Sequence, residues 1–144
     1  MKRKEVEQKA FDRFQAGFHC AEAVSETIIE SFSKEPVSHI PKAASGFGGG
    51  IGGTKCETCG ALTGGVIALG WLYGRMEPGT DKQKIYVLAA EFRNRFLDKF
   101  GSTNCRAILD NLGSQENMMK CKKLAGDAAG ILYDIVLEEG ADSK

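Results

Sequence analysis

The chain has 144 residues, of which 42% are hydrophobic and 26% are charged, a composition typical of an ordinary globular protein. Its 19 Lys and Arg residues balance its 19 Asp and Glu residues, so no basic surface indicates binding to nucleic acid or to an anionic membrane. Residues 1–8 are too charged to begin a secretory signal, and the apolar run 61–73 is shorter than the about 20 residues that span a bilayer. We therefore expect one cytoplasmic domain over residues 1–144, with no membrane insertion.

Apolar residues recur at helical spacing along most of the chain. This pattern predicts helices over residues 4–16, 19–32, 38–45, 59–74, 80–100 and 105–112, and a last helical segment from residue 114. Gly101 and Gly113 are placed to end two of these helices, and Thr80 with Gln83 has the spacing of a capping box. No segment alternates with the two-residue period of a strand. We expect an all-α bundle of about five to six helices around residues 59–74, a central glycine-rich apolar helix with small residues at small-x-x-x-small spacing.

Seven glycines between Gly46 and Gly60 precede or surround the pair Cys56 and Cys59. Glycine offers no side chain to bury, so such a run indicates a backbone that turns sharply or approaches another group closely. Backbone N–H groups of Gly48, Gly50 and Gly53 are candidates for binding an anion or a cofactor. The alternative is a tight loop that only presents Cys56.

Five cysteines, an odd number, in a chain without an evident export signal argue against a disulfide framework and favour metal binding, redox activity or burial. Cys20, Cys59 and Cys105 each fall in the first turn of a predicted helix, and Cys121 lies on the apolar face of its segment. A helix N-terminus favours a thiolate over a thiol. We therefore expect lowered pKa values for Cys20, Cys59 and Cys105. Within the Cys-x-x-Cys pair, Cys59 is expected to be more acidic than Cys56.

These elements together resemble the family of redox-active proteins named after its pattern, C_GCAxxG_C_C. The resemblance rests on residues 17–21 (Gly-Phe-His-Cys-Ala), the glycine loop 46–53, the core Cys-Gly-Ala-Leu-Thr-Gly at residues 59–64, and the later single cysteines Cys105 and Cys121. It covers nearly the whole chain, and Cys56 lies outside the pattern. The family's more distant similarity to part of the split-Soret cytochromes implies a helical fold that can form a homodimer.

Three functions are open at this point. In the first, Cys20, Cys59, Cys105 and Cys121 bind a metal ion, zinc included, or an iron–sulfur cluster used in electron transfer, because four thiolates suit both. In the second, Cys56 and Cys59 are the catalytic pair of a dithiol–disulfide oxidoreductase. In the third, the protein is a helical interaction module in which the cysteines only pack. Any partner would be a redox or membrane-transport protein, whose identity the sequence does not give.

Several other patterns do not fit their usual functions. Residues 48–53 match G-x-G-x-x-G in letters but follow no hydrophobic strand, so a dinucleotide site is not expected. Gly60 follows the second cysteine of the Cys-x-x-Cys pair where a haem-binding motif has His, so no covalent c-type haem is expected. His19 is expected to face solvent, and His39 is given no role.

Overall fold

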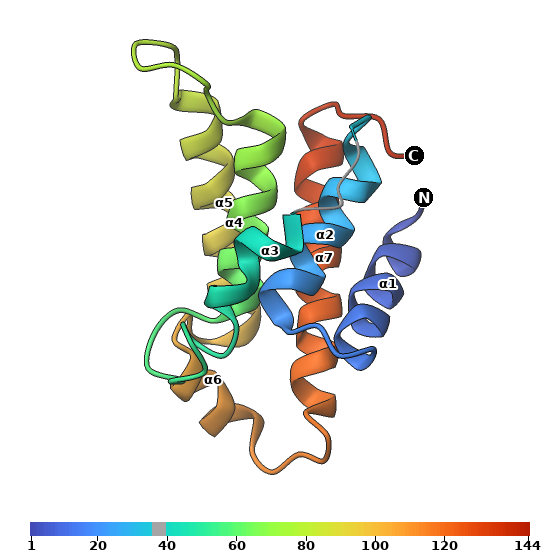
Figure 1. Ribbon diagram of the computed structural model, residues 1–144, viewed down its shortest axis with the longest axis vertical. Helices are drawn as coiled ribbons and strands as arrows, with labels where there is room; N and C mark the ends of the chain where they lie inside the picture. The colour runs from blue at the N-terminus through green and yellow to red at the C-terminus, as the bar shows by residue number, and fades with distance from the viewer. Residues whose placement is uncertain (36–39) are drawn as a thin grey trace.

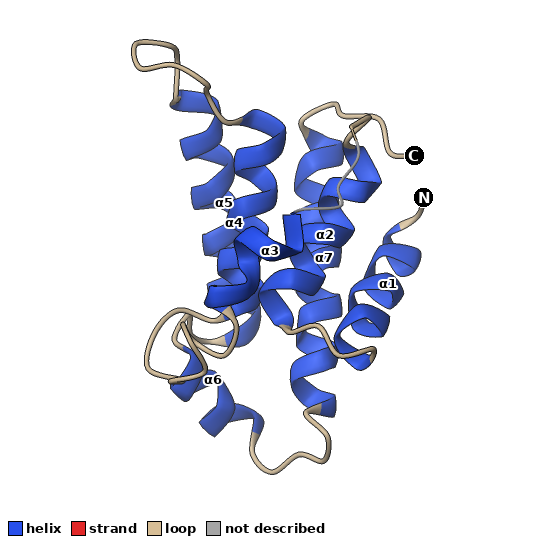
Figure 2. Ribbon diagram, in the orientation of Figure 1, coloured by secondary structure: helices blue, strands red, loops and turns tan. Residues whose placement is uncertain are grey.

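The structure, a computed structural model, describes residues 1–35 and 40–144. Within these residues it is all-α, as predicted, with no strand and one isolated antiparallel bridge between Thr58 and Asn104 (Figures 1 and 2). The helices are α1 (Arg3–Gln15), α2 (Cys20–Phe32), α3 (Ile40–Ala44), α4 (Gly60–Tyr73), α5 (Gln83–Phe100), α6 (Cys105–Leu112) and α7 (Met119–Glu138), with a 3₁₀ turn, η1 (Ser45–Phe47).

One hydrophobic core joins all the long helices. Helices α1, α2 and α7 pack against one another, α4 and α5 form a second pair, and contacts of α2 and α7 with α4 close the bundle (Figure 1). The fully buried side chains include Phe92 and Phe96 of α5, Leu69 of α4 and Leu132 of α7. The apolar residues that recur at helical spacing in the sequence therefore face the core.

The glycines of α4 let it lie directly against its neighbours. A Cβ atom added at Gly64 would be 2.3 Å from the carbonyl oxygen of Ala21 in α2, and one at Gly65 would be 2.2 Å from the ring of Phe92. Both distances are far below van der Waals contact, so only glycine allows this approach. The small-x-x-x-small spacing of the sequence thus corresponds to the α2–α4 contact.

Helix α4 contacts α2, α5 and α7, but it is not buried on every side. Val66, Gly70 and Trp71 are exposed, so the nearly continuous apolar sequence does not reflect complete burial. None of the described helices is long and apolar enough to cross a membrane.

Two predicted helix starts are wrong. Helix α5 begins at Gln83 rather than Thr80, because the Gln83 N–H is capped by the Asp81 carboxylate (2.7 Å) while the Thr80 hydroxyl donates to the Glu77 carbonyl. Helix α7 begins at Met119 rather than residue 114, because Asn117 and Met118 adopt left-handed conformations (φ 50° and 56°) that interrupt a helix. The predicted helix 38–45 appears as α3 and η1, and its first residues, with His39, lie outside the described residues.

Candidate functional site

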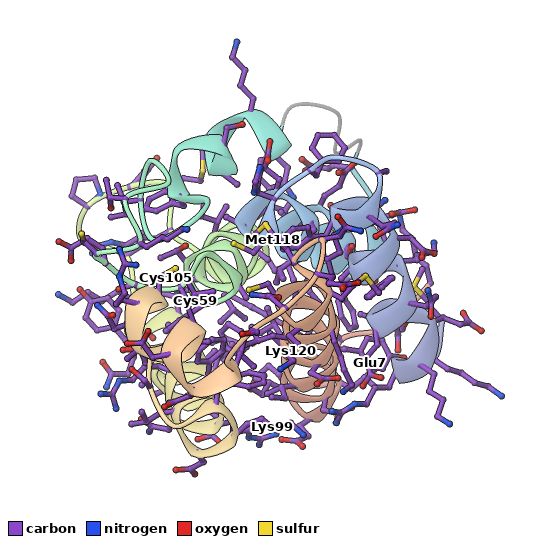
Figure 3. All side chains as sticks on the ribbon, turned by 90° about the horizontal axis from the view of Figure 1, so that it is seen from below. Glu7, Cys59, Lys99, Cys105, Met118 and Lys120 are labelled. Carbon is purple, nitrogen blue, oxygen red and sulfur yellow. The ribbon has the colours of Figure 1, made fainter. Side chains whose placement is uncertain are left out.

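Four cysteines from four helices line one cavity. Cys20 is the first residue of α2, Cys59 is the N-cap of α4, Cys105 is the first residue of α6 and Cys121 is the third residue of α7. Their cavity has a volume of about 50 Å³ and is otherwise lined largely by apolar groups, including Phe14. It lies at the end of the bundle where the glycine loop and α6 meet, and Figure 3, seen from that end, shows Cys59 and Cys105 next to each other.

Backbone hydrogen bonds fix the positions of Cys59 and Cys105. The Cys59 N–H donates to the Thr103 carbonyl and the Cys105 N–H donates to the Glu57 carbonyl, both at 2.8 Å. The Asn104 side chain accepts from the backbone N–H of the third residue of α6, which caps this helix, and donates to the Cys56 carbonyl at 2.9 Å. The start of α6 and the start of α4 are therefore tied together, with one cysteine on each.

Two glycines leave room for the sulfur atoms. A Cβ at Gly60 would be 2.3 Å from Cys20 Sγ, and a Cβ at Gly50 would be 2.7 Å from the Cys105 Cβ. Gly50 also has φ 69°, a left-handed conformation that side chains rarely adopt. The glycines that follow and precede Cys59 thus allow α2, α4 and α6 to bring their cysteines to the same cavity.

The sulfur atoms receive hydrogen bonds from N–H groups. The Gln115 amide Nε2 donates to Cys121 Sγ at 3.2 Å, while its Oε1 accepts from the Cys121 backbone N–H at 3.0 Å. The backbone N–H of Gly49 acts on Cys20, and N–H groups in the first turn of α4 act on Cys59, in each case favouring the thiolate. Such donors stabilise thiolates and tune metal–sulfur sites.

Burial nevertheless favours the protonated thiol at three of the four cysteines, Cys20, Cys59 and Cys105. It raises the pKa of Cys59 to about 12, and it also raises the pKa values of Cys20 and Cys105, with the neighbouring cysteines adding to the effect. The expected lowering of these pKa values at helix N-termini is therefore wrong. Desolvation of a charged sulfur outweighs the backbone N–H groups, although Lys55 and Arg106 favour the thiolate of Cys105.

The raised pKa of Cys59 predicts a loss of stability at alkaline pH. The unfolded chain releases this proton near pH 9, whereas the folded protein retains it to about pH 12. Folding is therefore favoured by this thiol at lower pH, and the free energy of unfolding should fall by about 1.4 kcal/mol per pH unit above pH 9. Denaturant unfolding of metal-free protein at pH 8 and pH 10 measures this decline, and Cys59→Ala should reduce it. An equal decline in both proteins would contradict the assignment.

The cavity fits a sulfur-bound metal centre in the chemistry of its donors. Four thiols are the donor set of tetrahedral zinc and of iron–sulfur clusters, and about 50 Å³ is more than the roughly 10–15 Å³ that one water needs. As the side chains stand, the described residues contain no group of three or more His, Cys, Asp or Glu side chains that could hold a metal ion. Binding would therefore have to draw the sulfur atoms inward and release their protons.

The remaining predicted site residues lie outside this cavity or at its edge. Cys56 is exposed, does not line the cavity, and donates from Sγ to the Thr54 carbonyl at 3.3 Å. His19 is exposed, as predicted, but it also lines the cavity and its ring lies 5.8 Å from that of Phe14. The N–H of Gly53 donates to the Gly48 carbonyl at 3.0 Å, so this group serves the loop itself.

Polar and sulfur-containing residues beside the cysteines were not predicted as site residues from the sequence. Lys55 and Met118 line the cavity, and Gln115 holds Cys121. Only the position of Lys55, next to the Cys-x-x-Cys pair, could have marked one of them. Gln115 and Met118 reach the site because residues 113–118 form a loop instead of helix.

Comparison with known proteins identifies one family. The model of the family described as "Putative redox-active protein (C_GCAxxG_C_C)" matches residues 18–135, which include all five cysteines and the glycine loop. Neither the curated proteins nor the solved structures include a match. The structure gives the family's pattern a physical meaning, because its cysteines line one cavity and its glycines, Gly60 and Gly64, allow α4 to approach α2.

Proposed function

Because this chain belongs to the C_GCAxxG_C_C family of redox-active proteins, we propose that it transfers electrons through a metal centre bound by Cys20, Cys59, Cys105 and Cys121. The observation that supports this proposal most is that these four cysteines, separated by up to 101 positions in the sequence, line the same cavity. An iron–sulfur cluster, when bound, supplies a one-electron redox centre. Zinc would suit the same donors but has no redox chemistry of its own.

The protein's own groups are arranged to hold negative charge in this cavity. Each of the four cysteines lies at the start of a helix, where unpaired N–H groups carry roughly half a positive charge. The Gln115 amide and the Gly49 N–H add donors to individual sulfurs, and Lys55 and Arg106 lie close enough to Cys105 to favour its thiolate. These groups compensate for part of the desolvation that raises the pKa values of Cys20, Cys59 and Cys105.

The apolar surroundings also suit electron transfer. Phe14, Ile108 and Leu124 line the cavity, and apolar groups of this kind would limit the access of water to a bound centre and tune its redox potential. Cys59 and Cys105 are only 8% exposed. Electrons would enter or leave at the glycine-loop end of the bundle, where His19 and Lys55 are exposed beside the cavity.

The observations do not favour the dithiol alternative. A thiol–disulfide exchange at Cys56 and Cys59 needs a nucleophilic thiolate on one of them. Cys59 is buried with a pKa of about 12, and the exposed Cys56 directs its sulfur to the Thr54 carbonyl. Cys56 thus differs from the other four cysteines in two ways. It is exposed to solvent, and it does not line the cavity that they share.

The proposal is tested by the metal and acid-labile sulfide content of protein purified without oxygen. Iron with sulfide and a visible absorption spectrum is the expected result. Zinc alone would remove the electron-transfer role while leaving the four-cysteine site. Protein without metal or sulfide, and not reconstituted by iron and sulfide under reducing conditions, would contradict the proposal.

A further inference from the structure

A second, wider cavity lies directly against the cysteine cavity. It has a volume of about 600 Å³ and lies between the glycine loop on one side and residues 115–118 with Leu109 on the other. This volume falls within the roughly 300–1,000 Å³ of small-molecule sites. The two cavities share five lining residues, namely His19, Gly49, Lys55, Leu109 and Met118. We call the wider cavity the loop cleft.

The polar groups of the loop cleft suit a negative ligand. Lys55 supplies a positive charge, and the Asn117 amide on the opposite wall supplies N–H donors. The Gln115 amide has one further N–H besides the one that it donates to Cys121 Sγ. None of the described residues that line the cleft is acidic. The carboxylate of Glu22, on the first turn of α2, accepts from the backbone N–H of His19 and from the Ser45 hydroxyl, each at 3.0 Å.

Both walls of the loop cleft hold backbone in a costly conformation. Residues 49–53 are all left-handed, with φ between 60° and 71°, and they include Ile51, a β-branched residue for which this is unusual. Asn117 and Met118 on the facing wall have φ 50° and 56°. Non-glycine residues rarely adopt this conformation, and strain of this kind clusters at ligand-binding sites. The loop is held in shape by internal bonds such as Lys55 N–H to the Gly49 carbonyl, 2.8 Å.

We propose that the loop cleft binds a small molecule with an oxyanion group, carboxylate or phosphate, which pairs with Lys55 beside the cysteine cavity. A molecule bound there would contact His19, Lys55 and Met118, the same residues that separate the cleft from the thiols. The binding itself does not depend on the proposed metal centre. If that centre is present, the ligand lies next to it, as a substrate or a regulator of the redox reaction would.

The test is a titration of the full-length protein with inorganic phosphate, followed by the amide resonances of the glycine loop. We expect saturable shifts at Gly49, Gly52 and Gly53. Lys55→Gly should weaken binding about tenfold, because it removes a charge-assisted contact. Glycine is suited to the left-handed conformation of Lys55 (φ 63°), so this variant keeps the loop backbone. Lys55→Arg, which keeps the charge, should retain binding.

A matched control is Lys99→Met, which removes an exposed lysine at the end of α5, well away from Cys59 and Met118 in Figure 3. It should bind phosphate like the natural protein. Unchanged affinity in Lys55→Gly, or shifts that do not saturate or that lie outside the loop cleft, would overturn the proposal. Repeating the titration with Cys59→Ser separates the two proposals, because phosphate should still bind when no metal centre can form.

Discussion

Replacing Gly64 by alanine should destabilise the protein by about 2–3 kcal/mol, a large fraction of the stability of a domain of this size. The added Cβ would be 2.3 Å from the Ala21 carbonyl oxygen and 2.7 Å from the Ala21 Cα, and backbone atoms cannot rotate away as a side chain can. Helices α2 and α4 would have to separate. Since Cys20 and Cys59 lie at the starts of these helices, metal content should fall with stability. Denaturant unfolding and metal analysis measure both effects.

Gly70 provides the matched control on the same helix. A Cβ at Gly70 would meet nothing within 4 Å, and the residue is exposed. Gly70→Ala should therefore stabilise the protein by about 0.5–1 kcal/mol, through the better helix propensity of alanine. Equal changes in stability for Gly64→Ala and Gly70→Ala would contradict the close packing of α2 against α4 at Gly64.

Replacing any one of Cys20, Cys59, Cys105 or Cys121 by serine should lower the affinity for the metal more than tenfold and reduce the metal content of the purified protein. Removing a group that only hydrogen-bonds to a metal ligand already lowers metal affinity about 10–100-fold. Removing the ligand itself should lower it at least as much. The four variants should behave alike, because all four thiols line the same cavity. Metal analysis after purification without oxygen, with the visible spectrum, is the measurement.

Cys56→Ser is the control for this series. Cys56 is exposed and outside the cavity, so its replacement should leave metal content and spectrum unchanged. Loss of metal in Cys56→Ser, together with retention in Cys121→Ser, would assign the ligands to the Cys-x-x-Cys pair instead. Folding of every variant is checked by its helical circular dichroism signal.

The sequence predicted those parts of the fold that depend on local patterns. The predicted stop at Gly101 ends α5 and the one at Gly113 ends α6, while Asn104 caps the start of α6, because caps and left-handed glycines act within one turn. The periodicity of its apolar face predicted the start of α2 at residue 19, one residue before the observed start at Cys20. The start of α7 at Met119 was not predicted, because no local sequence signal marks the left-handed conformation of Asn117 and Met118.

The properties of the site depend on packing, which the sequence does not describe. The helix starts correctly placed Cys20 and Cys105, but the pKa of a thiol is set by burial as well, and burial comes from distant residues such as Phe14 and Leu124. Cys121 was not predicted at a helix start, so the convergence of four N-termini became visible only in the structure. The loop cleft likewise needs residues 48–55 and 115–118 on facing walls.

The measurement that tests the central claim most directly is metal-edge X-ray absorption on protein purified without oxygen. The claim that four cysteine thiolates bind the metal predicts a first coordination shell of sulfur only, at about 2.3 Å. Cys59→Ser should lose this shell and Cys56→Ser should keep it. Nitrogen or oxygen as a main ligand, or protein that binds no metal, would contradict the claim and leave the cysteine cavity without a redox role.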